Sequence, residues 1–330
     1  MSFSMRFDNV YLLSSGTVVG PKEKKGPFGH YFDHAVKNCY ASEKSFEDGE
    51  MRMVKTAIDI SLKKCKLSID KIPMLFGGDL TNQIAISSRV SQDLPGAFVG
   101  VYAACATSTL SIGLAATYIH LGVIPYAIAY TSSNYAVAER QFRYPNDYGI
   151  QKKESTTTTI TGAASFVLSR KKSAIQVTEM TYGSVFDSKQ SDLNDMGSPM
   201  AYAAYHTIQD HLHNFHREVE DYDLILTGDL SKIGSKVLRD CFRADGMDLY
   251  QHQDAGFMIY HREEEKVYAG GSGPACLAVM AGSVILKEMQ EGKYHRVLLV
   301  ATGALFSPTL SQQKHDIPVI AHALTLEVSK

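Results

Sequence analysis

The sequence predicts an α/β fold made of two similar halves. Short apolar runs of strand length alternate with longer segments in which apolar residues recur at helical spacing. The halves also resemble each other: residues 73–83 match 222–233, and the strand, turn and helix around Cys105 match 268–305. We therefore predict a duplicated unit, with halves over 1–172 and 173–330 and a site between them near the carboxyl ends of the strands.

The predicted elements follow from this alternation. In the first half, helical spacing covers 43–67, 84–94 and 106–121, and apolar runs predict strands over 73–80, 97–104 and 125–133. An irregular polar segment then precedes one further strand within 156–171. In the second half we predict helices near 199–217, 232–243 and 275–291, and strands near 222–229, 255–262, 296–303 and 317–328.

Composition excludes several classes of protein. A chain of 330 residues with 45% hydrophobic content can bury a large core. Its 33 Lys and Arg residues nearly balance 35 Asp and Glu residues and are scattered, so nucleic acid is not an expected partner. Five cysteines without a CxxC pair suit a reducing compartment. We expect no signal peptide, because residues 1–16 lack a basic start followed by a long apolar core. We expect no transmembrane segment, because Gly122 and Pro125 divide the apolar stretch 111–133.

Cys105 lies where a predicted strand turns into a helix. The free N–H groups and positive dipole end of that helix would favour a thiolate or a bound carboxylate. Ser108 follows one helical turn later and can offer a hydroxyl. Each residue also has a structural interpretation, since a cysteine can be a small buried residue and a serine can serve the helix start. Asp79 and Asp229 occupy equivalent strand ends and can cap the turns that follow.

Histidines offer few further candidates. His315 and His322 are the remaining candidates for a catalytic base. We interpret the cluster at 206–216 as a solvated helix face, because its spacing completes no familiar zinc site. The cluster contains His206, His211, His213 and His216.

Glycines and arginines leave their roles open. Gly270, Gly271 and Gly273 match no nucleotide-binding loop, and we expect them to permit close approach of the backbone at the floor of the site. Arg140 and Arg143 could guard the pocket or pack at a dimer interface.

Four of these segments together resemble the superfamily of thiolases and ketoacyl-carrier-protein synthases. They are the Cys105 turn and residues 162–170, 270–275 and 297–305. The resemblance covers essentially the whole chain. It implies a duplicated, five-layer αβαβα arrangement, and usually a homodimer.

The sequence is similar, more closely, to the stage V sporulation protein AD family, a non-enzymatic branch of that superfamily. Residues 14–33, 78–83, 138–149, 221–235, 269–279 and 300–323 carry this likeness. It implies binding of dipicolinic acid, the pyridine-2,6-dicarboxylate that endospores store as a calcium chelate. The place implied is the developing spore, peripheral to the spore inner membrane, beside channel proteins that move the ligand in sporulation and germination. No cofactor is implied, apart from calcium carried with dipicolinate.

The resemblance also implies how this chain differs from the enzymes. A condensing enzyme uses two further polar side chains, His with His or His with Asn, where this chain has Gly228 with Asp229 and then Gly271. We therefore expect a ligand site at Cys105, Ser108 and Asp79, with Asp229 and Gly271 nearby. Beside a dianion, Asp79 would need bound calcium or a proton. Two alternatives remain: an acyltransferase or condensing enzyme using Cys105 with a base such as His322, and a dimeric scaffold that binds no ligand.

Overall fold

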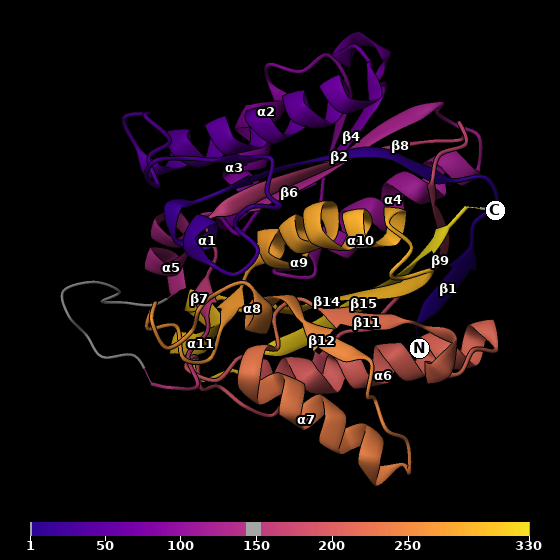
Figure 1. Cartoon of the computed structure of the whole chain (residues 1–330). Helices are drawn as coiled ribbons and strands as arrows, with labels where there is room; N and C mark the ends of the chain where they lie inside the picture. Colours follow the sequence, from indigo (N-terminus) through magenta and orange to yellow (C-terminus); the bar gives the residue numbers. More distant parts are fainter. Residues whose placement is uncertain (1, 143–152, 330) are drawn as a thin grey trace.

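The first half of the chain supplies strands and helices in alternation (Figure 1). The structure, a computed structural model, describes residues 2–142 and 153–329. The elements of the first half are β1 (Phe3–Arg6), β2 (Tyr11–Val19), α1 (Pro21–Lys25), β3 (His34–Ala35), α2 (Phe46–Cys65), β4 (Met74–Gly78), α3 (Ala85–Ser91), β5 (Ala97–Gly100), α4 (Thr107–His120), β6 (Tyr126–Ser133), α5 (Tyr135–Phe142), β7 (Thr158–Thr159) and β8 (Gly162–Ser169).

The second half repeats this plan. Its central helix contains a π-helical turn between two α-helical parts. The elements are β9 (Ile175–Tyr182), β10 (Phe186–Asp187), α6 (Gly197–Phe215), β11 (Leu224–Thr227), α7 (Ser231–Ala244), β12 (His252–Asp254), α8 (Ala255–Met258), β13 (Gly271–Ser272), α9 (Pro274–Met280), the π-helical turn (Ala281–Ile285), α10 (Leu286–Gln290), β14 (Arg296–Ala304), α11 (Pro308–Gln312) and β15 (Pro318–Val328).

The strand order confirms the duplication. The main sheet runs β5-β4-β6-β8-β2-β9-β15-β14-β11-β12, so the order β2, β8, β6, β4, β5 on one side mirrors β9, β15, β14, β11, β12 on the other. The halves join where β2 and β9 pair antiparallel through Tyr11 with Gln176 and Leu12 with Ile175. In the first half, β4 is parallel to both β5 and β6, and β8 is antiparallel to β6. In the second half, β11 is parallel to both β12 and β14, and β15 is antiparallel to β14.

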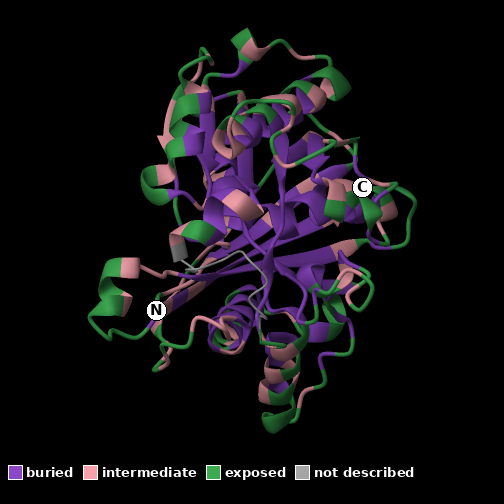
Figure 2. Ribbon diagram, turned by 90° about the vertical axis from the view of Figure 1, so that its left-hand side faces the viewer, coloured by how far each residue is buried: buried purple, intermediate pink, exposed green. Residues whose placement is uncertain are grey.

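Helices cover both faces of each half-sheet. In Figure 1, α2 and α3 lie over the first half-sheet, α6 and α7 lie under the second, and α4, α9 and α10 lie between the two. Figure 2 shows buried residues concentrated in the strands and central helices, with exposed residues on the outer helices. This is the predicted five-layer αβαβα fold. Among the described residues, no helix is both long enough and apolar enough to cross a bilayer.

One predicted strand is wrong. Within 255–262, the first four residues form the short helix α8, preceded by the three-residue strand β12, and the rest belong to no helix or strand. Asp254 causes the switch, because its carboxylate accepts a hydrogen bond from Phe257 N at 2.9 Å and caps α8. The same carboxylate accepts from the backbone N–H groups of Leu230 and Ser231, so it fixes the start of α7 as well.

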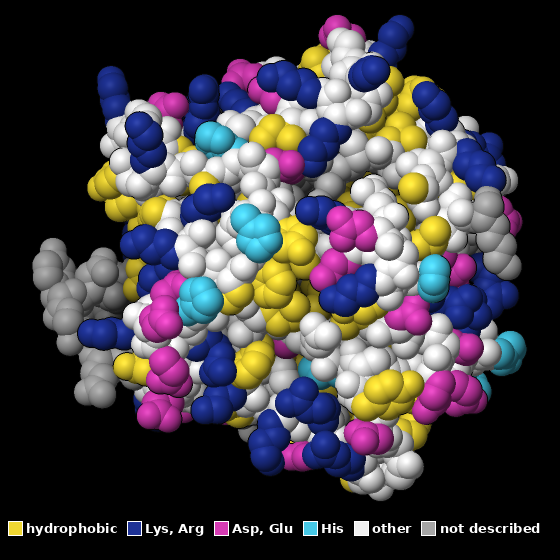
Figure 3. Space-filling view, in the orientation of Figure 1, with side chains coloured by type: hydrophobic (Ala, Val, Ile, Leu, Met, Phe, Trp, Pro, Cys, Tyr) yellow, Lys and Arg dark blue, Asp and Glu magenta, His cyan; other side chains and the backbone are white. Residues whose placement is uncertain are grey.

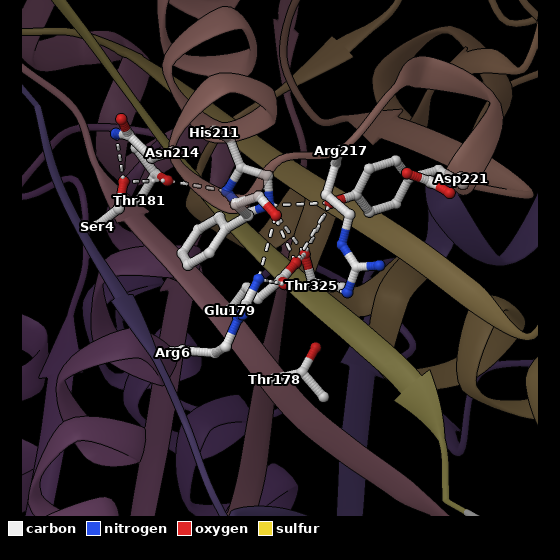
Figure 4. Close-up of polar contacts among 12 residues, drawn as sticks. Ser4, Arg6, Thr178, Glu179, Thr181, His211, Asn214, Arg217, Asp221 and Thr325 are labelled. Atoms are coloured by element: carbon white, nitrogen blue, oxygen red, sulfur yellow. Dashed lines mark hydrogen bonds and ion pairs between the residues drawn. The ribbon is translucent and has the colours of Figure 1, made fainter.

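A buried polar network corrects the interpretation of the histidine cluster (Figure 4). His206, His213 and His216 are exposed, as a solvated face requires, but His211 is fully buried. Its Nδ1 lies 2.8 Å from Thr181 Oγ1 and its Nε2 lies 2.9 Å from Thr325 Oγ1. The network therefore ties α6 to β9 and β15.

The network also holds a buried carboxylate. Glu179 on β9 is 1% exposed and accepts a hydrogen bond from Arg217 at 3.1 Å, with Arg6 of β1 at 3.2 Å (Figure 4). Two guanidinium groups compensate the desolvation of this charge. This arrangement anchors the N-terminal strand to the second half.

Candidate ligand-binding site

A sharp turn presents Cys105 between β5 and α4. Ala104 adopts a left-handed backbone conformation with φ 49°, which is strained for a residue with a side chain. Thr107 stabilises the turn, since its Oγ1 accepts from Ala103 N at 3.0 Å and donates to Ala104 O at 2.6 Å. Gly303 of β14 packs directly against the turn, where a Cβ would lie 2.2 Å from Ala103 O. The two halves thus meet at this residue.

A cavity opens above Cys105. It measures about 620 Å³, including the part that is open to solvent. Its lining residues come from both halves: Leu80, Asn82, Tyr102, Ala104, Cys105, Gln141, Thr157, Thr159, Met196, Met200, Ser272, Ala304, Phe306 and Pro308. The lining is apolar with neutral hydrogen-bonding groups, which is the usual character of a small-molecule site.

Ser272 is the side chain that approaches Cys105. Its Oγ lies 3.6 Å from Cys105 Sγ, within reach of a sulfur hydrogen bond. Gly271, the residue expected where the condensing enzymes carry His or Asn, lies one position earlier. Gly271 faces away from the cavity, because a Cβ there would lie 2.8 Å from Ile160 Cγ2 and 3.1 Å from Ile259 Cγ2. Its carbonyl accepts from Ser231 Oγ at 2.6 Å, so Gly271 holds the turn.

The surroundings of Cys105 disfavour a thiolate. Burial raises the pKa of the Cys105 thiol well above its usual value, and the charge of Asp229 raises it further. The hydrogen bonds from Ser272 and Gly273 oppose these effects only in part. The N–H groups of Ala106 and Thr107 already bond to the carbonyls of Ala103 and Ala104. Together these groups stabilise the neutral thiol, whereas the end of the helix was expected to stabilise the thiolate.

Asp79 is used by the backbone. Its carboxylate accepts from Thr81 N at 2.8 Å, from Thr81 Oγ1, and from Ser87 N at 2.8 Å, and the residue is 0% exposed. These contacts fix the turn after β4 and the start of α3, which favours the capping interpretation. Asp79 does not line the cavity, although its neighbours Leu80 and Asn82 do.

Ser108 and Asp229 are buried and do not line the cavity. Ser108 is 2% exposed, and its hydroxyl has no hydrogen-bond partner among the described residues. Asp229 is 0% exposed and accepts from Gly273 N at 2.9 Å, which ties the end of β11 to the turn before α9. Its Oδ2 has no partner within the described part of the chain. Burial and the neighbouring Asp254 raise the pKa of Asp229 well above its usual range.

The free energy of unfolding of Asp229→Asn, relative to that of the wild type, should increase as the pH rises. The raised pKa means that the folded state binds a proton that the unfolded state releases, so wild-type stability falls as pH rises from about 3.8 through the folded-state pKa. The amide introduced by Asp229→Asn can still accept from Gly273 N but does not titrate. Urea unfolding of both proteins across this range measures the difference, and a stability difference that is constant with pH would contradict the prediction.

Several cavity residues were not predicted as site residues. Tyr102 is 48% exposed and lines the cavity, and burial of its hydroxyl raises the pKa of Tyr102 to about 12. Asn82 and Gln141 both line the cavity and are in contact, since Asn82 N donates to Gln141 Oε1 at 3.0 Å. Both lie in segments that carry the family resemblance, 78–83 and 138–149. The sequence alone does not indicate that α5 places Gln141 at this cavity.

The remaining candidates lie outside the cavity. His322 is 4% exposed, its Nδ1 accepts from Gly183 N at 3.1 Å, and burial lowers the pKa of His322 to about 4. His315 is exposed on the surface. Arg140 pairs with Glu47 of α2, whereas Arg143 lies outside the described residues. Within 2–142 and 153–329, no group of three or more His, Cys, Asp or Glu side chains is arranged to hold a metal ion.

Comparisons with known proteins agree with this architecture. A variant of Xanthomonas campestris OleA is 15% identical, with a TM-score of 0.63, over 97% of this chain and 99% of that one. The 3-oxoacyl-[acyl-carrier-protein] synthase III of Aquifex aeolicus is 11% identical, with a TM-score of 0.61, over 96% of this chain and 99% of that one. At these identities the likeness shows a shared thiolase-like fold.

Sequence comparison gives the family. The profile described as "Stage V sporulation protein AD" matches residues 2–327. The protein of that name from Bacillus subtilis (strain 168) is 44% identical over 319 residues, which cover 96% of this chain and 94% of the relative. The chain therefore belongs to the stage V sporulation protein AD family, whose members are sporulation proteins with a thiolase-like fold.

Proposed function

We propose that this protein binds dipicolinic acid, free or as its calcium chelate, in the cavity above Cys105. In this role it serves uptake of the ligand during sporulation and its release in germination. The observation that carries the proposal is the cavity itself, which lies at the junction of the two halves of a sporulation protein and combines apolar walls with neutral hydrogen-bonding groups.

The chemistry of the lining suits a planar aromatic acid. Tyr102, Met200 and Phe306 provide apolar and aromatic surface for a pyridine ring. Asn82, Gln141 and Ser272 belong to residue types that can donate hydrogen bonds to carboxylates. None of the described residues that line the cavity is Lys or Arg, so a calcium ion carried by the ligand would offset its negative charge.

The state of Cys105 supports binding over catalysis. A nucleophilic cysteine must ionise, and burial raises the pKa of this thiol. His322, the base of the alternative condensing mechanism, directs Nδ1 to the backbone of Gly183 and does not line the cavity. We therefore propose that the protein is not an enzyme.

The proposed role implies binding partners for this protein. We expect the protein to work as a homodimer, peripheral to the inner membrane of the developing spore, beside channel proteins that carry dipicolinate. A dimeric scaffold that binds nothing is the competing proposal, and ligand titration separates the two.

Calorimetric titration of dipicolinate into the full chain tests the proposal. We expect saturable binding, weakened at least tenfold by Cys105→Phe because the added ring fills the cavity. Cys241→Phe is the matched control, since Cys241 lies on α7 away from the cavity and its variant should bind normally. Titrations in calcium and in EDTA show whether the metal is required. Thermal melts confirm that each variant is folded.

Two results would overturn the proposal. Equal affinity in wild type and Cys105→Phe would place the ligand elsewhere, and absence of heat and of thermal stabilisation would favour the scaffold. Incubation with acyl-CoA followed by intact-mass measurement tests the enzyme alternative. A thioester that forms on the wild type but not on Cys105→Ala would establish acyl transfer.

A further inference from the structure

A second cavity lies between the start of β2 and α10. It measures about 880 Å³, including the part open to solvent, compared with about 620 Å³ above Cys105. Figure 3 shows the surface hollowed between the layer that contains α2 and the central helix, with Lys or Arg side chains at the rim. The two cavities share no lining residue. The second cavity is therefore separate from the proposed dipicolinate site.

Irregular backbone on both sides creates this space. The pairing of β2 with β8 shifts register between Leu12 and Ser14, a β-bulge in an otherwise regular ladder. Opposite it, the central helix widens into the π-helical turn at 281–285. The two irregularities are joined, because Ser15 Oγ donates to Gly282 O at 2.5 Å. Bulges and π-turns of this kind are frequent at functional sites.

The floor of the cavity is apolar. Leu12, Ile175 and Leu286 line it and are 4%, 2% and 7% exposed. The serine hydroxyls nearby already donate to backbone carbonyls: Ser14 Oγ to Ser61 O at 2.7 Å, and Ser283 Oγ to Val279 O at 2.5 Å. They can accept hydrogen bonds but have no proton left to donate. A ligand here therefore needs an apolar body and finds its donors elsewhere.

Two lysines supply those donors. Lys64 of α2 and Lys287 of α10 lie on opposite sides of the cavity, and both side chains are about half exposed, at 43% and 55%. Asp33 holds Lys64 at 2.7 Å and is itself fixed by Thr17 N at 3.0 Å. An ammonium group carries three N–H donors, so Lys64 can bind an anion while it keeps Asp33.

The residues that line the cavity carry one more positive than negative charge. Lys287 Nζ lies 4.8 Å from the centre of the Tyr31 ring and 4.0 Å from Glu291 at the rim. Asp33 is the one acidic residue among the described residues that line the cavity, against two lysines. An anionic head group is the chemistry that this excess recognises.

We propose that this second cavity binds an amphipathic anion, with a phosphate or carboxylate head between Lys64 and Lys287 and an apolar body against Leu12, Ile175 and Leu286. Such a group can belong to a free metabolite or to an anionic lipid. The site would then give the protein a second ligand, or a contact with a membrane surface, independent of dipicolinate.

Titration calorimetry with hexyl phosphate tests the proposal. We expect saturable binding at least tenfold tighter than that of inorganic phosphate, because the hexyl chain buries apolar surface. Lys64→Gln and Lys287→Gln should each weaken hexyl phosphate about tenfold. Lys236→Gln is the control, since it removes the same charge from an exposed position on α7, 76% exposed, and should change nothing. Dipicolinate affinity should be unchanged in all three variants.

Further measurements distinguish an anionic lipid from a free anion as the ligand, and certain results would overturn the proposal. Sedimentation with phosphatidylcholine vesicles that contain phosphatidylglycerol, lost in both cavity variants, would identify a lipid. Hexyl phosphate binding without sedimentation would identify a free anion. Absence of saturable binding, or equal binding in the cavity and control variants, would overturn the proposal. Displacement of hexyl phosphate by dipicolinate would also overturn it. The proposed dipicolinate site is tested separately by Cys105→Phe, which should leave hexyl phosphate binding intact.

Discussion

Replacing Gly303 with Ala should lower the free energy of unfolding by roughly 3 kcal/mol and weaken dipicolinate binding at least tenfold. The added Cβ would lie 2.2 Å from Ala103 O and 3.2 Å from Ala106 N, so it would collide with the backbone of the Cys105 turn. Neither side can yield easily. Gly303 is paired with Ile320 of β15 near the end of β14, and the Thr107 hydroxyl bonds to the backbone of the turn at Ala103 and Ala104.

A second glycine separates this clash from the general cost of losing a glycine. Gly246 has φ 77° and nothing within 4 Å of a Cβ, so Gly246→Ala should cost about 1 kcal/mol, through backbone strain alone, and leave ligand affinity unchanged. Urea unfolding gives the stability of both variants and calorimetry gives the affinity. Similar losses in the two variants would show that close packing of β14 against the turn is not what positions Cys105.

The fold was predictable because its pattern is repeated. Strand-length apolar runs that alternate with helical spacing predicted the layers, and the similarity of the two halves predicted that they share one plan. The long strands β2 and β9 were not predicted, although they join the halves. Polar residues or glycine interrupt both segments, since β2 reads YLLSSGTVV and β9 reads IQVTEMTY, so neither is a continuous apolar run of strand length.

The details of the site were less predictable. Cys105 was recognisable from its place between a strand and a helix. Ser272 was not predicted as a site residue, because which member of a glycine-rich turn faces a cavity depends on the packing of Gly271 against Ile160. Asp79 and Asp229 end equivalent strands, yet one caps a helix and the other bonds to Gly273 N. Sequence symmetry predicts equivalent positions, whereas tertiary packing decides which contacts each side chain makes.

His211→Ala should lower the free energy of unfolding by roughly 3 kcal/mol near neutral pH, and this loss should shrink as the solution is acidified. The imidazole is fully buried and bonds to Thr181 and Thr325, so its removal leaves a cavity and takes one hydrogen-bond partner from each hydroxyl. Burial, with a smaller effect of Arg217, lowers the pKa of His211 to about 3. The histidine is therefore neutral in the folded protein across most of the accessible range.

The sign of the pH effect follows from this pKa. Below about pH 6.5 the unfolded chain binds a proton at His211 and the folded chain does not, so the wild type loses about 1.4 kcal/mol per pH unit that the variant does not lose. Between about pH 6.5 and pH 4.5 the difference in free energy of unfolding between the two proteins should narrow by about 2.3 kcal/mol, because the unfolded histidine is already half protonated at pH 6.5.

Urea unfolding of wild type, His211→Ala and His213→Ala at several pH values measures this change. His213 is exposed on the same helix, so its variant should track the wild type at every pH. A His211→Ala penalty that stays constant on acidification would show that His211 is already charged in the folded state. In that case its partner would be the Glu179 carboxylate, which lies 3.8 Å from Nε2, and the network would be an ion-pair cluster. The expected narrowing instead identifies a neutral imidazole that joins α6 to β9 and β15 through the hydroxyls of Thr181 and Thr325.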